Sequence, residues 1–335
     1  MIAGCLGSKK PTFALSDQES NIMTHLRKLL IVGPLPAGLQ KDLSQNFELV
    51  PLWTVEDRAS FLQKHFGEFV GGVTMSRHGG QADVFECLRD TVLVCFGVGF
   101  DGIDLKAAKL NNVAVSTTPD VLTDCVADIA FALMLGLARQ IVPAAQFVQA
   151  GKWSQGAFGL STRVSGKRLG IVGLGRIGAA IAKRAQGFDM SIRYFARKPV
   201  LGVPYVFYSD LLHLAAESDF LVIACKGGAE TKHLVSAEVL KALGPSGFVI
   251  NVARGSVIDE QAMVQALQNQ EIAGAGLDVL TNEPQIPEAL LNNDRVLILP
   301  HVAASTFETR SAMEKLVIDN LNSFLNTGKV LTPPV

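Results

Sequence analysis

The residues best suited to chemistry are three polar side chains spread over the last quarter of the chain. Arg254 stands in NVARGSVID, Glu283 in LDVLTNEP and His301 in LILPHVA. A guanidinium binds carboxylates through paired hydrogen bonds, and an imidazole beside a carboxylate can give or take a proton near neutral pH. Singly, each would be an ordinary loop residue. Together they suit the binding and protonation of a 2-oxo acid.

The composition narrows the classes of partner. The 335 residues, 48% of them hydrophobic, are enough for two domains that each have a core. Thirty basic and 31 acidic residues give a net charge of −1, so we expect neither nucleic acid nor a membrane surface as a partner. The longest apolar stretches have the length of a strand and predict no membrane span. Small molecules are the expected partners.

Five cysteines indicate a reducing compartment. They are odd in number, show no CxxC spacing and mostly lie in apolar runs: Cys5, Cys87, Cys95, Cys125 and Cys225. We therefore expect reduced core residues of a cytoplasmic protein, with neither disulfides nor a metal site.

The first 22 residues differ in character from the rest, and we expect them to form a disordered extension. Although IAGC resembles a lipoprotein cleavage site, neither a basic nor an apolar segment precedes Cys5. The regular pattern begins at Lys28, so Met23 is a candidate start.

From Lys28 the chain twice alternates buried-strand runs with amphipathic stretches. This alternation predicts the α/β class, with two doubly wound parallel-sheet, Rossmann-like domains. The expected strands are Leu29–Val32, Phe47–Pro51, Val70–Met75, Val92–Phe96 and Val113–Ser116, then Arg168–Val172, Ser191–Phe195, Phe220–Ala224, Phe248–Val252, Gly274–Asp278 and Val296–Leu299. The expected helices of the first series lie around Leu39–Gln45, Asp83–Leu88 and Leu105–Leu110.

Between the two series, residues Val121–Gln149 form a long apolar helical pattern that ends at Gly151. Such a stretch could connect the two domains and pack between two subunits, which predicts a homodimer. The alternative is a helix buried in one core.

A glycine motif opens the second series. Gly173, Gly175 and Gly178 form GxGxxG directly after a strand-like run and before a helix-like one. The first glycine permits a tight turn, the second lets a pyrophosphate approach the backbone, and the third allows close packing of helix and strand. A cluster of helix-packing glycines is the alternative. The flanking elements favour dinucleotide binding.

The next expected strand carries the signal for cofactor choice. An NAD-specific protein places an acidic residue there to bind the ribose 2′-hydroxyl, whereas this chain has Arg197 and Lys198, with no carboxylate nearby in the sequence. Two cations suit a 2′-phosphate. We therefore expect NADP(H), with NAD(H) as the weaker alternative. Both side chains could instead be ordinary solvated charges.

These features resemble the D-isomer-specific 2-hydroxyacid dehydrogenase family, and in particular its glyoxylate and hydroxypyruvate reductase branch. The resemblance covers nearly the whole chain from Met23. The segments that carry it are FGVGFDGIDL, TTPDVLTDCVADIA, GKRLGIVGLGRIGAAIAKRAQGFDM, INVARGSVIDEQAMVQAL, GAGLDVLTNEP and LPHVAASTFETR.

The resemblance implies a role for each member of the trio. Arg254 would bind the carboxylate and the 2-oxo group of the substrate, and His301 would protonate the developing alkoxide as hydride arrives. Glu283 would pair with His301 and favour its charged form.

The resemblance also places the other substrate contacts. Backbone N–H groups of Val98 and Gly99 would meet the substrate carboxylate. The loop MSRHGG, with Ser76, Arg77 and His78, would face the same cleft and select among 2-oxo acids. It could equally be an ordinary surface loop.

Further cofactor contacts follow from the same resemblance. The implied residues are Thr123, Arg176, Ile177, Val252, Ala253, Asp278 and Ala303. Asp278 could instead cap the turn after its strand. The chain departs from the family pattern at Lys226, Gly227 and Gly228, where a proline-containing turn is usual, and at Ala303 and Ala304, where a glycine is common.

The resemblance implies a discontinuous substrate-binding domain, residues 23–119 plus 306–335, and an NADP-binding domain, residues 120–305. Hydride transfer would occur in the cleft between them. The expected reaction is NADPH-dependent reduction of glyoxylate or hydroxypyruvate to glycolate or D-glycerate. Two alternatives remain: a reductase of broader 2-oxo acids, such as 2-ketogluconate or hydroxyphenylpyruvate, and a dinucleotide-sensing protein without turnover, similar to a corepressor.

Overall fold

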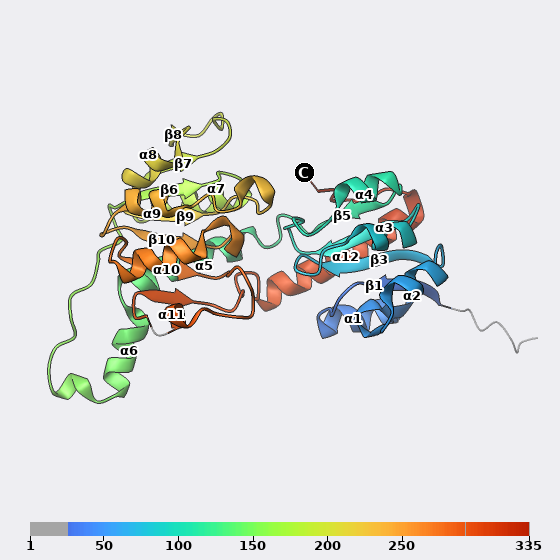
Figure 1. Cartoon of the computed structure of the whole chain (residues 1–335), viewed down its shortest axis with the longest axis horizontal. Helices are drawn as coiled ribbons and strands as arrows, with labels where there is room; N and C mark the ends of the chain where they lie inside the picture. Colours follow the sequence, from blue (N-terminus) through green and yellow to red (C-terminus); the bar gives the residue numbers. More distant parts are fainter. Residues whose placement is uncertain (1–25, 292, 335) are drawn as a thin grey trace, which may run out of the picture.

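The computed structural model describes residues 26–291 and 293–334, so the extension expected at residues 1–22 lies outside the described residues. The chain forms two lobes, each a parallel β-sheet with helices packed on it (Figure 1). The predicted α/β class with two parallel-sheet domains is confirmed.

The first lobe contains five strands in the order β2-β1-β3-β4-β5. They are β1 (Arg27–Ile31), β2 (Phe47–Pro51), β3 (Phe69–Met75), β4 (Val92–Phe96) and β5 (Ala114–Ser116). The connecting helices are α1 (Ala37–Ser44), η1 (Leu52–Thr54), α2 (Arg58–Lys64), α3 (Ala82–Cys87) and α4 (Leu105–Leu110). Every residue of β4 is buried, as expected of a central parallel strand covered on both faces.

The second lobe contains seven strands in the order β12-β11-β10-β9-β6-β7-β8. They are β6 (Arg168–Val172), β7 (Ser191–Phe195), β8 (Val206–Tyr208), β9 (Phe220–Ile223), β10 (Phe248–Asn251), β11 (Gly274–Leu277) and β12 (Val296–Ile298). The helices are α7 (Arg176–Gln186), α8 (Leu211–Ala216), η3 (Ala229–Thr231), α9 (Ala237–Leu243), η4 (Gly255–Val257), α10 (Glu260–Gln268) and α11 (Glu288–Leu291). Strand β6 pairs with β7 on one side and with β9 on the other, so the strand order reverses at β6, and the carboxyl ends of these strands form the usual ligand edge of such a sheet.

The apolar stretch between the lobes is two helices, where the sequence predicted one. The backbone adopts a left-handed conformation at Gln140 (φ 52°), which separates α5 (Thr123–Ala138) from α6 (Ile141–Gln149) with a bend of 57°. Helix α5 packs on the second sheet, whereas α6 has no buried residue and projects from the lobe, followed by η2 (Lys152–Ser154) (Figure 1).

Among the described residues, no single helix is both long and apolar enough to cross a membrane; the bent pair α5 and α6 meets that criterion only by combined length and composition.

The C-terminal helix α12 (Phe307–Thr327) returns to the first lobe. It begins at Phe307, because the Thr306 hydroxyl accepts a hydrogen bond from the N–H of Thr309 and caps the helix. Its apolar side packs against β4, and the following tail is bonded to Thr117 through Thr332. The start of α12 therefore lies between the two lobes, where Arg310 and Met313 line a cavity.

Candidate active site

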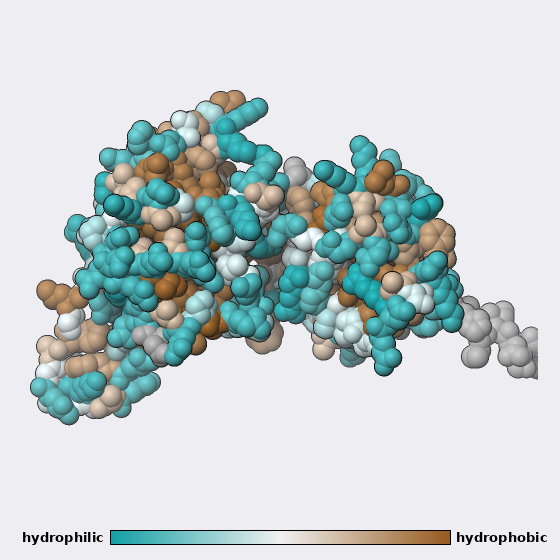
Figure 2. Space-filling model, viewed as in Figure 1, coloured by the Kyte–Doolittle hydropathy of each residue, from teal (hydrophilic) through white to brown (hydrophobic). Residues whose placement is uncertain are grey.

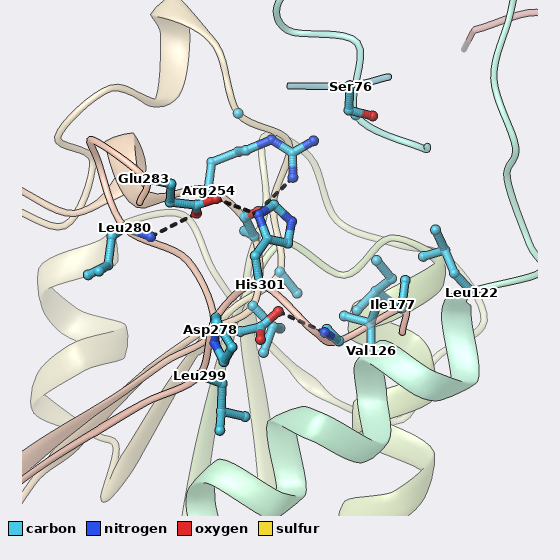
Figure 3. Close-up of a pocket in the computed structure, with 18 of the residues that line it drawn as sticks. Ser76, Leu122, Val126, Ile177, Arg254, Asp278, Leu280, Glu283, Leu299 and His301 are labelled. Atoms are coloured by element: carbon cyan, nitrogen blue, oxygen red, sulfur yellow. Dashed lines mark hydrogen bonds and ion pairs between the residues drawn. The ribbon is translucent and has the colours of Figure 1, made fainter. Parts of the chain in front are cut away.

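A cavity of about 1420 Å³ lies between the two lobes. Its walls come from loops that follow the strands of both sheets, where doubly wound folds bind their ligands. The lining residues include Ser76, Arg77, Val98, Gly99 and Arg310 from the first lobe and its returning helix, and Gly175, Arg176, Ala253, Arg254, Asp278, Glu283 and His301 from the second. The predicted trio is thereby brought to one cavity, and Figure 3 shows its three side chains side by side.

His301 and Glu283 form a hydrogen-bonded pair. The distance from His301 Nδ1 to Glu283 Oε2 is 2.7 Å, and Glu283 Oε1 accepts from the backbone N–H of Leu280 at 3.0 Å. Burial alone would raise the pKa of the Glu283 carboxyl, but these two hydrogen bonds and the charges of His301 and Arg254 lower it below its ordinary value. The carboxylate thus stays ionised near neutral pH, and Nε2 is the ring nitrogen left for a substrate.

Asp278 fixes the turn that presents His301. Its buried carboxylate accepts from the N–H of Val302 at 2.9 Å and from that of Ala303 at 3.0 Å, while its carbonyl accepts from the N–H of His301. These bonds hold His301 in a left-handed conformation with φ 53°, which is uncommon for a residue with a side chain. Both carboxylate oxygens are used in anchoring, and a contact between Asp278 and the cofactor stays a prediction.

Arg254 is held between the lobes. Its Nε lies 3.1 Å from Asp101 Oδ1 in the turn after β4, and its Nη1 donates to the carbonyl of Ala253 at 2.8 Å. The guanidinium packs directly on Gly99, where an added Cβ would stand 1.5 Å from Nη2. Sequence reasoning missed Asp101, although it stands in the quoted segment FGVGFDGIDL two residues after Gly99.

The turn after β4 offers free donors to an anion. The backbone N–H groups of Val98 and Gly99 donate no hydrogen bond to any residue that the structure describes, and both residues line the cavity. Ser76 packs on this turn, since a Cβ added at Gly97 would lie 2.0 Å from its Oγ. The geometry is therefore compatible with the carboxylate contact that the sequence predicts.

The side chains of the loop after β3 do not all point into the cavity. Ser76 and the exposed Arg77 border the cavity. The ring of His78 also borders it but packs against Gly33, and its Nδ1 is buried without a hydrogen-bond partner among the described residues. Of these three residues, Arg77 has the most exposed side chain, and it forms no ion pair with any residue that the structure describes.

The three motif glycines each meet a distinct steric demand. Gly173 has φ 95°, a region that favours glycine, and its N–H donates to the carbonyl of Phe195 at 2.9 Å. A Cβ added at Gly175 would meet nothing within 4 Å, whereas one at Gly178 would lie 2.1 Å from the carbonyl oxygen of Gly173. Open space at Gly175 beside the first N–H groups of α7 fits a pyrophosphate.

We expect Gly178→Ala to lower the free energy of unfolding by about 1 to 3 kcal/mol, because the new methyl group must push α7 away from the backbone of Gly173. Urea denaturation of the purified protein measures this change. Gly175→Ala is the matched control: it should cost little stability but weaken NADPH binding, since its methyl group enters the open space. Equal stability losses for both variants would contradict the steric assignment.

The remaining predicted cofactor contacts line the same cavity. They are Thr123, Arg176, Ile177, Val252, Ala253 and Ala303. The guanidinium of Arg176 is already paired, with its Nε 3.0 Å from Asp120 Oδ1.

Arg197 and Lys198 follow β7 and lie outside the cavity lining, exposed to solvent. No carboxylate is near them in the sequence, but the fold brings one close, because Glu230 of η3 places Oε2 3.4 Å from Arg197 Nη1. The sequence did not show this contact, since the two residues are 33 positions apart. A 2′-phosphate would have to compete with Glu230 for Arg197 or draw the arginine away.

Gly227, one of the residues that depart from the family pattern, makes room for Arg254, because an added Cβ would lie 2.6 Å from Arg254 Cγ. The preceding Lys226 places Nζ 5.2 Å from the ring centroid of Phe100. This second contact links the loop after β9 to the first lobe. This segment therefore supports the interdomain position of Arg254.

The fold and the cavity define a two-domain α/β protein with a dinucleotide-binding edge and an arginine, a glutamate and a histidine facing it. The chain matches the family model described as "D-isomer specific 2-hydroxyacid dehydrogenase, NAD binding domain" over residues 131–303. It is 41% identical to glyoxylate/hydroxypyruvate reductase A of Arabidopsis thaliana and 41% identical to hydroxyphenylpyruvate reductase of Plectranthus scutellarioides. Each match covers 92% of this chain and 98% of the relative.

A solved structure gives the same result. The NADPH-dependent glyoxylate/hydroxypyruvate reductase of Sinorhizobium meliloti, in complex with NADP and malonate, has a TM-score of 0.84 and 40% identity, covering 91% of this chain and 96% of that one. The chain belongs to the D-isomer-specific 2-hydroxyacid dehydrogenase family, and its cofactor is a nicotinamide dinucleotide, NAD(P).

Proposed function

We propose that the protein is an NADPH-dependent reductase that converts glyoxylate and hydroxypyruvate to glycolate and D-glycerate. The observation that carries the proposal is the His301–Glu283 pair, which shares one cavity with Arg254 and with the unused N–H groups of Val98 and Gly99. A carboxylate site beside a poised proton donor is what reduction of a 2-oxo acid requires. The similarity of the chain to glyoxylate/hydroxypyruvate reductases also supports this choice of substrates.

Each group in the site has a role under this proposal. Arg254 and the N–H groups of Val98 and Gly99 bind the substrate carboxylate, and Arg254 also donates to the 2-oxo oxygen. The bound dinucleotide supplies the hydride. His301 gives the proton on Nε2 to the alkoxide oxygen and becomes neutral, while Glu283 accepts from Nδ1 and keeps the ring oriented.

The proposal is tested by following NADPH consumption with glyoxylate and with hydroxypyruvate at neutral pH. We expect saturable turnover with both substrates. Tight binding of NADPH without turnover of any 2-oxo acid would overturn the enzyme assignment and favour the dinucleotide-sensing alternative.

A broader substrate range is the second candidate. The hydroxyphenylpyruvate reductase that the chain resembles is as similar as the glyoxylate/hydroxypyruvate reductase, since each is 41% identical to this chain. A higher kcat/KM for hydroxyphenylpyruvate or 2-ketogluconate than for hydroxypyruvate would establish this alternative.

We expect Arg197→Ala to lower the ratio of kcat/KM for NADPH to that for NADH by about tenfold, because a charge-assisted contact with the 2′-phosphate is lost. Steady-state kinetics with both cofactors measure the ratio. Glu230→Gln is the matched test in the other direction: it removes the carboxylate beside Arg197 and should raise the ratio. An unchanged ratio in Arg197→Ala, or a higher wild-type kcat/KM with NADH, would contradict the proposed preference.

We also propose a homodimer that acts in the cytoplasm. The projecting arm formed by α6 and η2 exposes apolar side chains, with 53% of Ile141, 51% of Val148 and 70% of Trp153 accessible, and Figure 2 shows apolar surface on this arm at the lower left. Burial against a second copy would remove this surface from water. A molar mass of one chain in light scattering would contradict the dimer.

The two domains take the same limits under this proposal as in the sequence prediction. Residues 23–119 with 306–335 bind the substrate, and residues 120–305 bind the dinucleotide. The packing of α12 on β4 is the observation that supports assigning the C-terminal segment to the first domain.

A further inference from the structure

We propose that Arg77 and Arg310 form a second anion-binding site in the cavity, and that the preferred substrates are 2-oxo acids with a second anionic group. The inference rests on the proposed function, because it assumes that the first carboxylate binds at Val98, Gly99 and Arg254. The second group would be a carboxylate or a phosphate, since both present several acceptor oxygens to guanidinium groups.

Arg310 stands on the cavity side of α12, next to the turn that would receive the first carboxylate. Its Cζ lies 5.4 Å from the ring centroid of Phe96, the residue directly before Gly97, and its Nη2 donates to Ser305 Oγ at 2.7 Å. The side chain is partly buried and lines the cavity. Stacking and one neutral hydrogen bond fix the guanidinium without neutralising it.

Arg77 approaches the same region from the loop after β3. It follows Ser76, whose Oγ touches the turn at Gly97, and its own Nη2 contacts the Sδ of Met75 at 3.8 Å. Both arginines line the same cavity. Burial lowers the pKa of Arg310 and the positive charge of Arg77 lowers it further, while Glu314 acts in the opposite direction. An anion bound between the two cations would reduce their repulsion.

The other two arginines of the described cavity wall are each paired with a carboxylate, which distinguishes them from Arg77 and Arg310. Arg254 is paired with Asp101 and Arg176 with Asp120. Neither Arg77 nor Arg310 forms an ion pair with any residue that the structure describes. Glu314 acts on Arg310 electrostatically, but its carboxylate packs against Gly38 instead of pairing with the guanidinium.

The unused charge has a consequence for substrate choice. Glyoxylate carries a single carboxylate, which the turn after β4 and Arg254 would bind, so Arg77 and Arg310 would face no partner. A 2-oxo acid with a second anionic group could use both sites at once. The two arginines would then contribute charge-assisted hydrogen bonds that a single-carboxylate substrate cannot make.

The test compares substrates that differ in the second charge. Initial rates with NADPH give kcat/KM for 2-oxopentanedioate and for its 5-methyl ester, which has nearly the same shape without the second charge. We expect the wild-type protein to prefer the dianion by about tenfold or more. Phosphooxypyruvate and 2-oxobutanedioate, compared with hydroxypyruvate, distinguish a phosphate from a carboxylate as the preferred group.

Two variants connect this preference to the arginines. In both Arg310→Gln and Arg77→Gln, the dianion-to-ester ratio of kcat/KM should fall at least several-fold toward one. Arg77 is exposed on a loop, so its variant keeps the test valid even if Arg310→Gln fails to fold. Arg58→Gln is the matched control, since Arg58 pairs with Asp83 away from the cavity lining and its loss should leave the ratio unchanged.

The outcomes separate this inference from the proposed function. Turnover of glyoxylate with equal kcat/KM for the dianion and its ester, or a ratio that survives both variants, would overturn the second site and leave the reductase assignment intact. Absence of turnover with every 2-oxo acid would overturn the reductase assignment instead. In that case, titration calorimetry of the wild-type protein with NADP⁺ tests the second site without turnover. Tighter binding of the dianion than of the ester would support the site, and equal affinities would overturn it.

Discussion

Replacing His301 with Gln should lower kcat for 2-oxo acid reduction by about 10²- to 10⁴-fold, the usual contribution of a positioned proton donor. Glutamine retains a polar side chain at the turn but cannot transfer a proton at neutral pH. The affinity for NADPH should change little, because the ring contacts Glu283 and the glycine turn after β6 is unaltered. Single-turnover rates and a fluorescence titration with NADPH measure the two effects.

Largely intact turnover in His301→Gln would show that another group donates the proton. Weaker NADPH binding in parallel with the lost turnover would instead show that the substitution disturbed the cofactor site. These outcomes separate proton transfer from a structural effect of the substitution.

Glu283→Gln tests the partner of His301, and its distinguishing effect is on how the stability of the protein depends on pH. The pKa of Glu283 is lowered in the folded protein, so its ionised form contributes stability above the unfolded pKa, and that contribution is lost as the pH falls through the folded pKa. Near neutral pH the carboxylate is therefore charged and accepts from His301 Nδ1. Its removal should cost less activity than the loss of His301, and urea denaturation at several pH values should show that the variant loses less stability on acidification than the wild type, because the carboxyl that must be protonated is gone.

Most strands were predictable from their apolar residues, and the strands buried on both faces gave the plainest pattern. Parallel strands covered by helices are continuous apolar runs, and Val92–Phe96 and Arg168–Val172 are predicted with the bounds that the structure has. Strand β8 was missed because it is a three-residue edge strand with Val206 largely exposed. The break at Gln140 was missed because only the backbone conformation, and not the apolar pattern, distinguishes two helices from one.

In the site, too, the features set by neighbouring residues in the sequence were predictable, and the contacts between distant residues were not. The glycine spacing around Gly173 is local, and the structure places those glycines where the predicted steric demands apply. Partnerships across the fold could not be predicted, because Asp101 reaches Arg254 and Glu230 reaches Arg197 only once the lobes and loops are assembled. Arg310 stood in the quoted segment LPHVAASTFETR, yet its place in the cavity depends on where α12 begins.

Substituting Gly99 with Ala should lower kcat/KM for glyoxylate by about 10²-fold, mostly through a higher KM, while the protein stays folded. The added Cβ would lie 1.5 Å from Arg254 Nη2. That atom ends a flexible side chain, so the guanidinium moves and the backbone does not. A displacement of about 1 Å is enough to cost two orders of magnitude when the displaced group orients the substrate.

Three measurements make this last expectation specific. The midpoint of thermal unfolding should change little, and NADPH affinity should hold, because Gly99 belongs to the first lobe. Gly156→Ala is the matched control, since a Cβ there would meet nothing within 4 Å, and its kinetics should equal those of the wild type. If Gly99→Ala also kept the wild-type kcat/KM, Arg254 could not bind the substrate from its position against this turn, and the carboxylate site would have to lie elsewhere in the cavity.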